Sequence, residues 1–218
     1  MRRILLISFL LSIMICMEAQ TPIRFSVHLD PQFVWLNSDD NSVKPDGSIF
    51  HMQVGLHMDY FFAPNYAFSL GLGINNLGGN LSYADSTDFT SKGEILPVGP
   101  NQGVRLNLQY LDIPLGLKLK SEELGYATLF LQLGFNPMIS LNAKATSEDG
   151  TLDKHDIQES VHLFNLGYHA GLGVEYQLGG NTALIGGLRW SAGLTDVTDN
   201  DQANVKTNAV SIHLGILF

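Results

Sequence analysis

The feature that most restricts the fold of this chain is a period-two alternation of apolar and polar residues that recurs along it. The alternation is longest in residues 104–120, a stretch of 17 residues that reads VRLNLQYLDIPLGLKLK. Because successive side chains of a β-strand point to opposite faces, this period predicts strands with one apolar and one polar face. A strand of this length is unusual in a soluble domain, where about five or six residues are common.

The alternation within residues 104–120 changes phase, since the apolar residues have even numbers up to Tyr110 and odd numbers from Leu111 onward. A slip of one residue is what a β-bulge produces, so we place a bulge at Tyr110 and Leu111. Pro114 cannot donate a hydrogen bond to a neighbouring strand. We therefore expect the sheet to be irregular at this proline.

Eight segments share the alternation, namely residues 23–36, 50–62, 66–77, 104–120, 126–143, 161–178, 182–195 and 205–218. Their connections are in turn long (37–49, 78–103, 144–160 and 196–204) and short (63–65, 121–125 and 179–181). This pattern is typical of transmembrane barrels with short periplasmic turns and long outer loops. We predict an all-β fold, an eight-stranded antiparallel up-and-down transmembrane β-barrel in the cell outer membrane, with periplasmic termini.

The size of the side chains indicates which face of the predicted barrel meets lipid. The apolar face carries mainly Leu, Ile, Val, Phe and Tyr, whereas the polar face is rich in Gly, Ser, Asn and Gln. Eight strands enclose room for side chains only, so the small polar residues fit the lumen and the bulky apolar residues face lipid. A soluble, lipocalin-like barrel with its apolar face inward is the alternative architecture.

The N-terminus reads as a targeting segment. Arg2 and Arg3 precede an apolar run over residues 4–17, and Ala19 offers a small residue for cleavage. We predict a signal peptide at residues 1–19 and a barrel domain at residues 20–218. The apolar run is too short for a helix that spans a bilayer. The net charge of −9 argues against a nucleic-acid partner.

Two short blocks resemble a known family. The block of Tyr110, Leu111, Asp112, Ile113, Pro114 and Leu115 resembles a motif of the PorT-like outer-membrane β-barrels of Bacteroidota. The C-terminal alternation of Leu214, Ile216 and Phe218 is similar to the signal read by the barrel-assembly machinery. The resemblance implies an outer-membrane location, surrounding lipid and the assembly machinery as partners and, for the namesake of the family, a part in type IX secretion.

The polar face brings titratable side chains into the predicted lumen. We expect a structural polar network made of Arg24, His28, Asp30, Asp112, His169, Arg189 and His213. Further inward charges are expected from Asp59, Arg105, Lys118 and Glu175. Buried charges must be paired or hydrated, so we predict an ion-paired, plugged interior in which Arg189 and Asp112 share a network. We predict neither a metal nor a cofactor, since His51 and His57 are expected near opposite ends of the lumen, away from the other histidines.

These features favour a non-enzymatic barrel with a structural, surface-interaction or secretion-associated role. A protein partner would dock at the surface loops or at the periplasmic rim. A narrow pore for small solutes is the main alternative. An enzyme could draw on the pairs Ser26/His28 and Ser211/His213, which no motif supports. Calcium could bind the acids of the long loops, such as Asp196, Asp199 and Asp201, although their spacing matches no known calcium loop.

Overall fold

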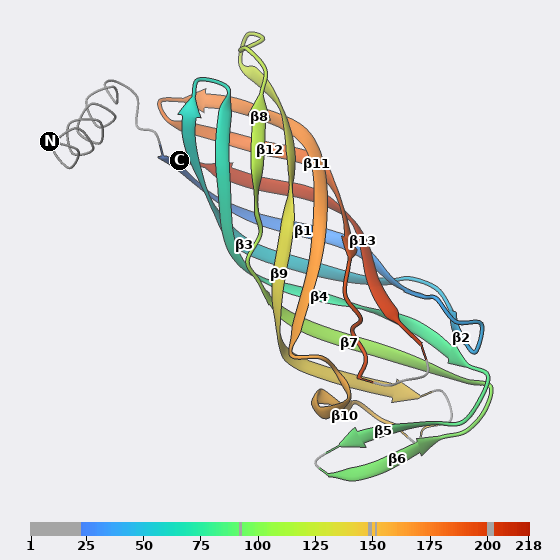
Figure 1. Cartoon of the computed structure of the whole chain (residues 1–218). Coiled ribbons are helices and arrows are strands. Elements are labelled where there is room, and N and C mark those ends of the chain that lie inside the picture. The colour runs from blue at the N-terminus through green and yellow to red at the C-terminus, as the bar shows by residue number, and fades with distance from the viewer. Residues whose placement is uncertain (1–22, 92, 148–149, 151, 200–202) are drawn as a thin grey trace, which may run out of the picture.

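The computed structural model describes residues 23–91, 93–147, 150, 152–199 and 203–218, and it shows an elongated barrel (Figure 1). The predicted signal peptide therefore lies outside the described residues. The wall consists of β1 (Ile23–Ser38), β3 (Ile49–Ala63), β4 (Tyr66–Tyr83), β7 (Gln102–Asp112) continued by β8 (Leu115–Lys120), β9 (Ala127–Ser147), β11 (Phe164–Gly179), β12 (Thr182–Gly193) and β13 (Val205–Leu217). Each strand pairs antiparallel with the next, which confirms the predicted eight-stranded barrel.

The first and last barrel strands close the ring. The ladder between β1 and β13 runs from the pair Ser26 and Leu217 to the pair Ser38 and Val205. Beyond it, the amide of Phe218 donates to the carbonyl of Phe25 over 2.8 Å. Closure matters because hydrocarbon offers no partner for a free backbone group.

The end of the barrel away from the chain termini, here called the loop end, carries the shorter elements (Figure 1). They are β2 (Val43–Pro45), the hairpin of β5 (Thr87–Ser91) and β6 (Glu94–Val98), β10 (His155–Asp156) and a 3₁₀ helix (Gln158–Ser160). The amide of Thr90 donates to Ser160 Oγ over 2.8 Å, which ties the hairpin to the 3₁₀ helix. No helix among the described residues is long and apolar enough to cross a membrane.

The wall reverses its polarity along the barrel, as β4 shows. In the half near the termini, Ser69 and Asn75 point inward while Leu72 is exposed on the outside. Toward the loop end the buried side chain is Leu81, and the outward position next to it is Asn80. The barrel is therefore built like a membrane protein in one half and like a water-soluble barrel in the other.

In the half near the termini, exposed apolar side chains form a continuous band, here called the apolar belt. Its members include Phe25, Val27, Leu29, Leu56, Leu70, Leu72, Leu117, Leu133, Leu172, Leu188, Ile212 and Leu214. Exposed apolar residues on every strand of a closed barrel are the surface that lipid covers. The prediction that the bulky apolar face meets lipid describes this half of the barrel.

At the loop end the apolar residues turn inward and form a packed core, here called the loop-end core. Its members are Val34, Leu36, Val43, Leu77, Leu81, Tyr83, Phe89, Val98, Val104, Leu106, Leu108, Tyr110, Met138, Ala143, Ala145, Leu152, Ile157, Val161, Val197, Ala203, Val205 and Ala209. A second, smaller apolar layer lies inside the barrel toward the termini, made of Phe130, Ala183, Ile185 and Leu217. The polar part of the lumen borders the loop-end core. Toward the termini its charged side chains lie at the level of the smaller apolar layer, since Lys118 Nζ is 5.0 Å from the centre of the Phe130 ring and Glu175 pairs with Ile185.

The polarity reversal overturns the expected change of phase in residues 104–120. Leu106, Tyr110, Asp112 and Lys118 are all buried on the inward face, so the even-numbered residues point inward throughout. The predicted bulge at Tyr110 and Leu111 is wrong. The same face of the strand points inward throughout, and it changes from apolar to polar along the barrel.

The register shift lies on the neighbouring strand β9. Gln109 pairs with Asn142 and Tyr110 with Ser140, which leaves Leu141 as the extra residue. The irregularity expected at Pro114 is present, since β7 ends at Asp112 and β8 begins at Leu115.

Two further expectations fail for the same reason. Arg105 was expected in the lumen, but it is exposed on the outer wall, because the lumen beside it is apolar. The third segment was expected to end at Leu77, yet β4 continues to Tyr83 with buried Leu81 and polar outward neighbours. Alternation with apolar residues inside and polar residues outside is ordinary for a water-exposed wall.

Candidate functional site

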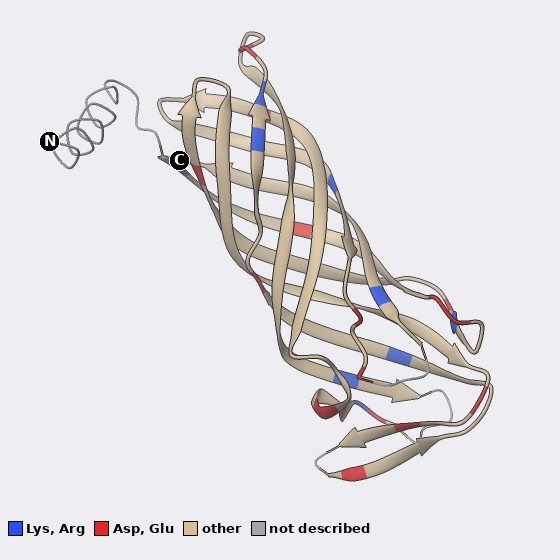
Figure 2. Cartoon of the chain, viewed as in Figure 1, with Lys and Arg blue, Asp and Glu red and all other residues tan. Residues whose placement is uncertain are grey.

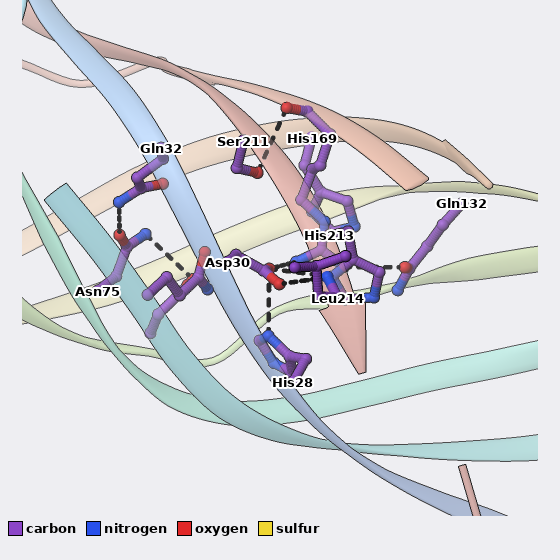
Figure 3. A network of polar contacts seen from close by, with 12 residues as sticks. His28, Asp30, Gln32, Asn75, Gln132, His169, Ser211, His213 and Leu214 are labelled. Atoms are coloured by element: carbon purple, nitrogen blue, oxygen red, sulfur yellow. Dashed lines mark hydrogen bonds and ion pairs between the residues drawn. The ribbon is translucent and has the colours of Figure 1, made fainter. Parts of the chain in front are cut away.

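The central feature of the lumen is Asp30, which receives hydrogen bonds and charge from three strands (Figure 3). Its carboxylate lies 3.1 Å from His28 Nδ1 and 2.9 Å from His213 Nδ1. Arg189 Nη1 lies 3.7 Å from Asp30 Oδ2, and the amide of Leu214 donates to Oδ1 over 3.3 Å. All four charged or imidazole side chains are buried, so Asp30 is the centre of a desolvated cluster.

The histidines of this cluster lie closer together than the sequence suggests. The ring of His57 stacks on that of His28 with centroids 4.3 Å apart, and it lies 6.0 Å from the ring of His213. The expectation that His57 lies away from the other histidines is therefore wrong. It came from counting along the strand, whereas antiparallel pairing brings His57 opposite Ser26, two residues from His28.

Among the described residues, His28, Asp30 and His213 form the group that could hold a metal ion, with ligand atoms within 4.8 Å of one another. Both imidazole Nδ1 atoms already face the Asp30 carboxylate, and the Arg189 guanidinium lies beside it. A dication would have to displace these contacts and share the site with a buried cation. The arrangement therefore favours a hydrogen-bonded, ion-paired cluster over a metal centre.

A second polar group surrounds Asp112, which is held by neutral amides. Gln53 Nε2 donates to Asp112 over 2.9 Å, and Asn136 Nδ2 donates to both carboxylate oxygens over 2.9 and 3.0 Å. Asn136 Oδ1 in turn lies 2.6 Å from His169 Nδ1. Within the described chain no hydrogen bond or ion pair joins Asp112 directly to Arg189. The two side chains occupy neighbouring groups of the same buried layer.

A third group forms the strongest charge cluster of the lumen. Lys118 Nζ lies 2.7 Å from Asp59 and 2.6 Å from Glu175, and Lys120 Nζ lies 2.6 Å from Glu175. Sequence reasoning placed Lys118, Asp59 and Glu175 inward but left them out of the predicted network. Lys118 and Asp112 both occupy even-numbered positions, which lie on the same face, and this signal could have placed Lys118 and its partners in the network.

Chains of hydrogen bonds connect the first and third groups. Arg189 Nη2 donates to Gln132 Oε1 over 3.1 Å, and Gln132 Nε2 donates to Ser69 Oγ over 3.1 Å. Ser69 Oγ then donates to Asp59 over 2.7 Å. Arg24 stands apart, because it is half-buried and has no hydrogen bond or ion pair among the described residues. We call the three groups together the polar layer.

The remaining residues singled out by the sequence have structural positions. Tyr110 lies in the loop-end core, while Leu115 faces outward in the apolar belt. Leu214, Ile216 and Phe218 are likewise exposed on the outside of β13 and at its end. The Ser/His pairs lie inside the lumen, where Ser26, His28, Ser211 and His213 are all buried.

The acidic residues of the last long loop organise the backbone. Asp196 Oδ1 accepts from the amides of Thr198 and Val205, over 3.0 and 2.8 Å. Asp39 accepts from the amide and the side chain of Asn204, over 2.8 Å each, and these hydrogen bonds lower the pKa of Asp39. The acids Glu148, Asp149 and Asp201 lie outside the described residues.

Comparison with known proteins gives a consistent result. The pattern of a family described as outer membrane protein beta-barrel domain matches residues 19–199. Neisserial surface protein A superposes with a TM-score of 0.49 at 14% identity, covering 88% of this chain and 95% of its own. OprG from Pseudomonas aeruginosa (TM-score 0.44, 15% identity, 89% and 95% covered) and Ail from Yersinia pestis (TM-score 0.43, 13% identity, 89% and 98% covered) are also similar. No curated protein matches in sequence.

Proposed function

The chain belongs to the outer membrane protein beta-barrel domain family and lies in the outer membrane, and on this premise we propose that it is a closed, non-conducting barrel acting through its loop end. Its role is then structural or one of surface interaction, with a protein partner docking on the loops. The observation that carries the proposal is the filling of the lumen by buried side chains. The loop-end core fills one end of the barrel, and toward the termini Lys118 pairs with Asp59 and Glu175 beside the smaller apolar layer.

The glycines of the polar face support a closed lumen. A methyl group added at Gly71 would meet the ring of His57 and the ring of Pro114. One added at Gly173 would meet the ring of Phe130 at 2.6 Å. Larger neighbours thus already fill the space that these glycines leave. This packing argues against the alternative of a narrow pore.

The loop end is suited to presenting a surface. The loop-end core continues the barrel as a packed, water-exposed body, and the hairpin of β5 and β6 is fixed on top of it. Exposed Ile95 on this hairpin gives the region an apolar side chain that a partner could cover. We place the termini in the periplasm and the loop end outside, because long loops project outward in barrels of this kind.

A narrower proposal follows from the YLDIPL block, which supports membership of the PorT-like barrels of Bacteroidota. Its residues serve the fold, since Tyr110 fills the loop-end core and Asp112 binds the amides of the polar layer. A part in type IX secretion rests on the resemblance alone. Deleting the gene and measuring secretion of type IX cargo tests that part separately from the closed-barrel proposal.

The closed barrel is tested by conductance in planar bilayers. We expect the purified protein to produce no channel steps, while a variant with Phe130→Gly and Leu217→Gly, which empties the apolar layer near the termini, should raise leakage. Reproducible single-channel steps from the unmodified protein would overturn the proposal and establish the pore.

Docking at the loop end needs its own experiment. Crosslinking on intact cells should capture a partner with the full chain and lose it when residues 88–97, nearly all of the β5–β6 hairpin, are replaced by a short glycine-serine turn. A crosslink that survives this replacement would place the contact elsewhere. The variant must retain the heat-dependent gel mobility of a folded barrel for the comparison to count.

A further inference from the structure

A groove of about 430 Å³ lies on the outer wall toward the loop end. It runs over β4, β7 and β9, and the residues that matter for its chemistry are Asp46, Asn80, Arg105, Asn107, Thr146 and Lys154. Figure 2 shows basic residues on β7 and β9 in this part of the wall. Two cations, Arg105 and Lys154, and one acid, Asp46, therefore line the groove.

Strand pairing brings these side chains onto one face. Arg105 lies opposite Asn80 on β4 and opposite Thr146 on β9, while Asn107 lies opposite Lys144. Arg105 Nε donates to Asn80 Oδ1 over 3.0 Å, which holds the guanidinium along the groove, and the described residues offer no acceptor to its terminal nitrogens. Lys144 thus adds a third cation at the edge of the groove.

The cations of this surface form no ion pair with an acid among the described residues. In the parts of the chain that the structure describes, the Lys and Arg side chains that form ion pairs are Lys118, Lys120 and Arg189, all in the lumen. No carboxylate of the described residues lies within 4.0 Å of the charged nitrogens of Arg105, Lys144 or Lys154, although the whole chain has 21 acidic and only 12 basic residues. Of the described acids, Asp46 lines the groove and Asp156 lies opposite Lys144 in the pairing of β10 with β9.

The groove lies just beyond the apolar belt. On β9 the last outward apolar residue is Leu141, and Lys144 and Thr146 follow three and five positions later. At about 3.4 Å per residue these positions lie roughly 10 and 17 Å further along a tilted strand. Lipid headgroups extend several ångströms beyond the hydrocarbon, so Lys144 falls within their layer and the groove opens directly above it.

We propose that this outer groove binds the phosphate-bearing headgroup of a glycolipid in the outer leaflet that surrounds the barrel. Arg105 and Lys154 would contact a phosphate, with Lys144 guarding the side nearest the membrane. Asn80, Asn107 and Thr146 supply hydrogen-bonding groups for sugar hydroxyls at the same site. The inference depends on the outward orientation of the loop end proposed above, and it is independent of whether the lumen conducts.

Native mass spectrometry of the full protein in a neutral detergent tests the groove. The added probes are diphosphorylated lipid A, the same lipid A without its phosphates, and phosphatidylglycerol. The test variant combines Arg105→Gln with Lys154→Gln. The matched control is Lys206→Gln, an exposed cation on the outer wall of β13 opposite Asn37, away from the groove. Each variant is first checked for the unheated gel mobility of a folded barrel.

We expect diphosphorylated lipid A to bind the unmodified protein and to bind the double variant about 25-fold more weakly, since each cation near an anionic lipid contributes about fivefold. Lys206→Gln should leave binding nearly unchanged. Equal binding of lipid A with and without phosphates, or an equal loss in Lys206→Gln, would overturn the proposal. Preferential binding of phosphatidylglycerol would overturn the assignment to the outer leaflet and would leave the closed-barrel proposal intact.

Discussion

Replacing Lys118 with methionine should destabilise the barrel by about 3 kcal/mol, the lower end of the cost of breaking a buried ion pair. Lys118 contacts both Asp59 and Glu175, and all three side chains are at most 5% exposed. Glu175 keeps Lys120 after the substitution, but Asp59 keeps only the hydroxyl of Ser69. The cost therefore comes mainly from one carboxylate left without a cation in a desolvated lumen.

The assay is denaturant unfolding of the protein in lipid vesicles, followed by the fluorescence of the two tryptophans, Trp35 and Trp190. The slope and the midpoint of the transition give the free energy of unfolding. Lys120→Met is the matched control, since Glu175 retains Lys118 at 2.6 Å. We expect this control to cost about 1 kcal/mol, because the remaining pair keeps the buried carboxylate compensated.

A double variant isolates the mechanism. Combining Lys118→Met with Asp59→Asn removes the cation and the carboxylate it leaves behind, so most of the lost stability should return, to within about 1 kcal/mol of the unmodified protein. The reasoning is refuted if Lys118→Met costs no more than Lys120→Met, or if the double variant is as unstable as Lys118→Met alone.

Three further outcomes are expected. Leu106→Asp places a charge in the loop-end core and should lower the free energy of unfolding by at least about 3 kcal/mol in the same assay, and an unchanged midpoint would contradict the reversed polarity. Gly78→Ala should destabilise the folded barrel by more than about 1 kcal/mol, because Gly78 has φ +142° and the added methyl would meet a backbone carbonyl. The control Gly186→Ala should be neutral, because the space around Gly186 is open. The lowered pKa of Asp39 means that its hydrogen bonds to Asn204 stabilise the folded protein at pH values above the ordinary carboxyl pKa. This stabilisation is lost as the pH falls through the lower pKa of the folded state. Proteolytic nicking near Asn204 should therefore increase in acid, and it should not increase in Asp39→Asn.

The sequence was sufficient to predict the number of strands and the location of the barrel. Alternation and loop length depend on local chemistry, and both are repeated in eight segments, so an error in one segment does not alter the architecture. The positions of Leu214 and Ile216 on the lipid face follow from the same period. These features can be predicted without knowing the height of each residue along the barrel axis.

The reversal of polarity along the barrel could not be predicted from the alternation. A period-two pattern says that two faces differ, but it does not say which face is inside at a given height. Leu106 and Leu117 are both apolar, yet one lies in the core and the other in the belt. Deciding between them requires the position of the membrane boundary, which depends on all strands together. The misplacement of Arg105 and of the bulge has this single origin.

The histidine cluster illustrates a different limit. His28 and His57 come from the consecutive strands β1 and β3, whereas His213 on β13 joins them only because the ring closes between its first and last strands. The stagger between paired strands decides which residues share a height, and it is set by the tilt of the whole barrel. Counting positions within one strand cannot supply that information.

The pairing of β1 with β13 also has a consequence for biogenesis. Until β13 is in place, β1 and β12 each present an unpaired edge, and lipid offers nothing to bond with those backbone groups. The polar layer would be equally incomplete, since His213 supplies one of the contacts of Asp30. We therefore expect insertion of this protein to end with the pairing of β13 with β1. A chain that has not reached this step needs another protein to cover the unpaired edges of β1 and β12.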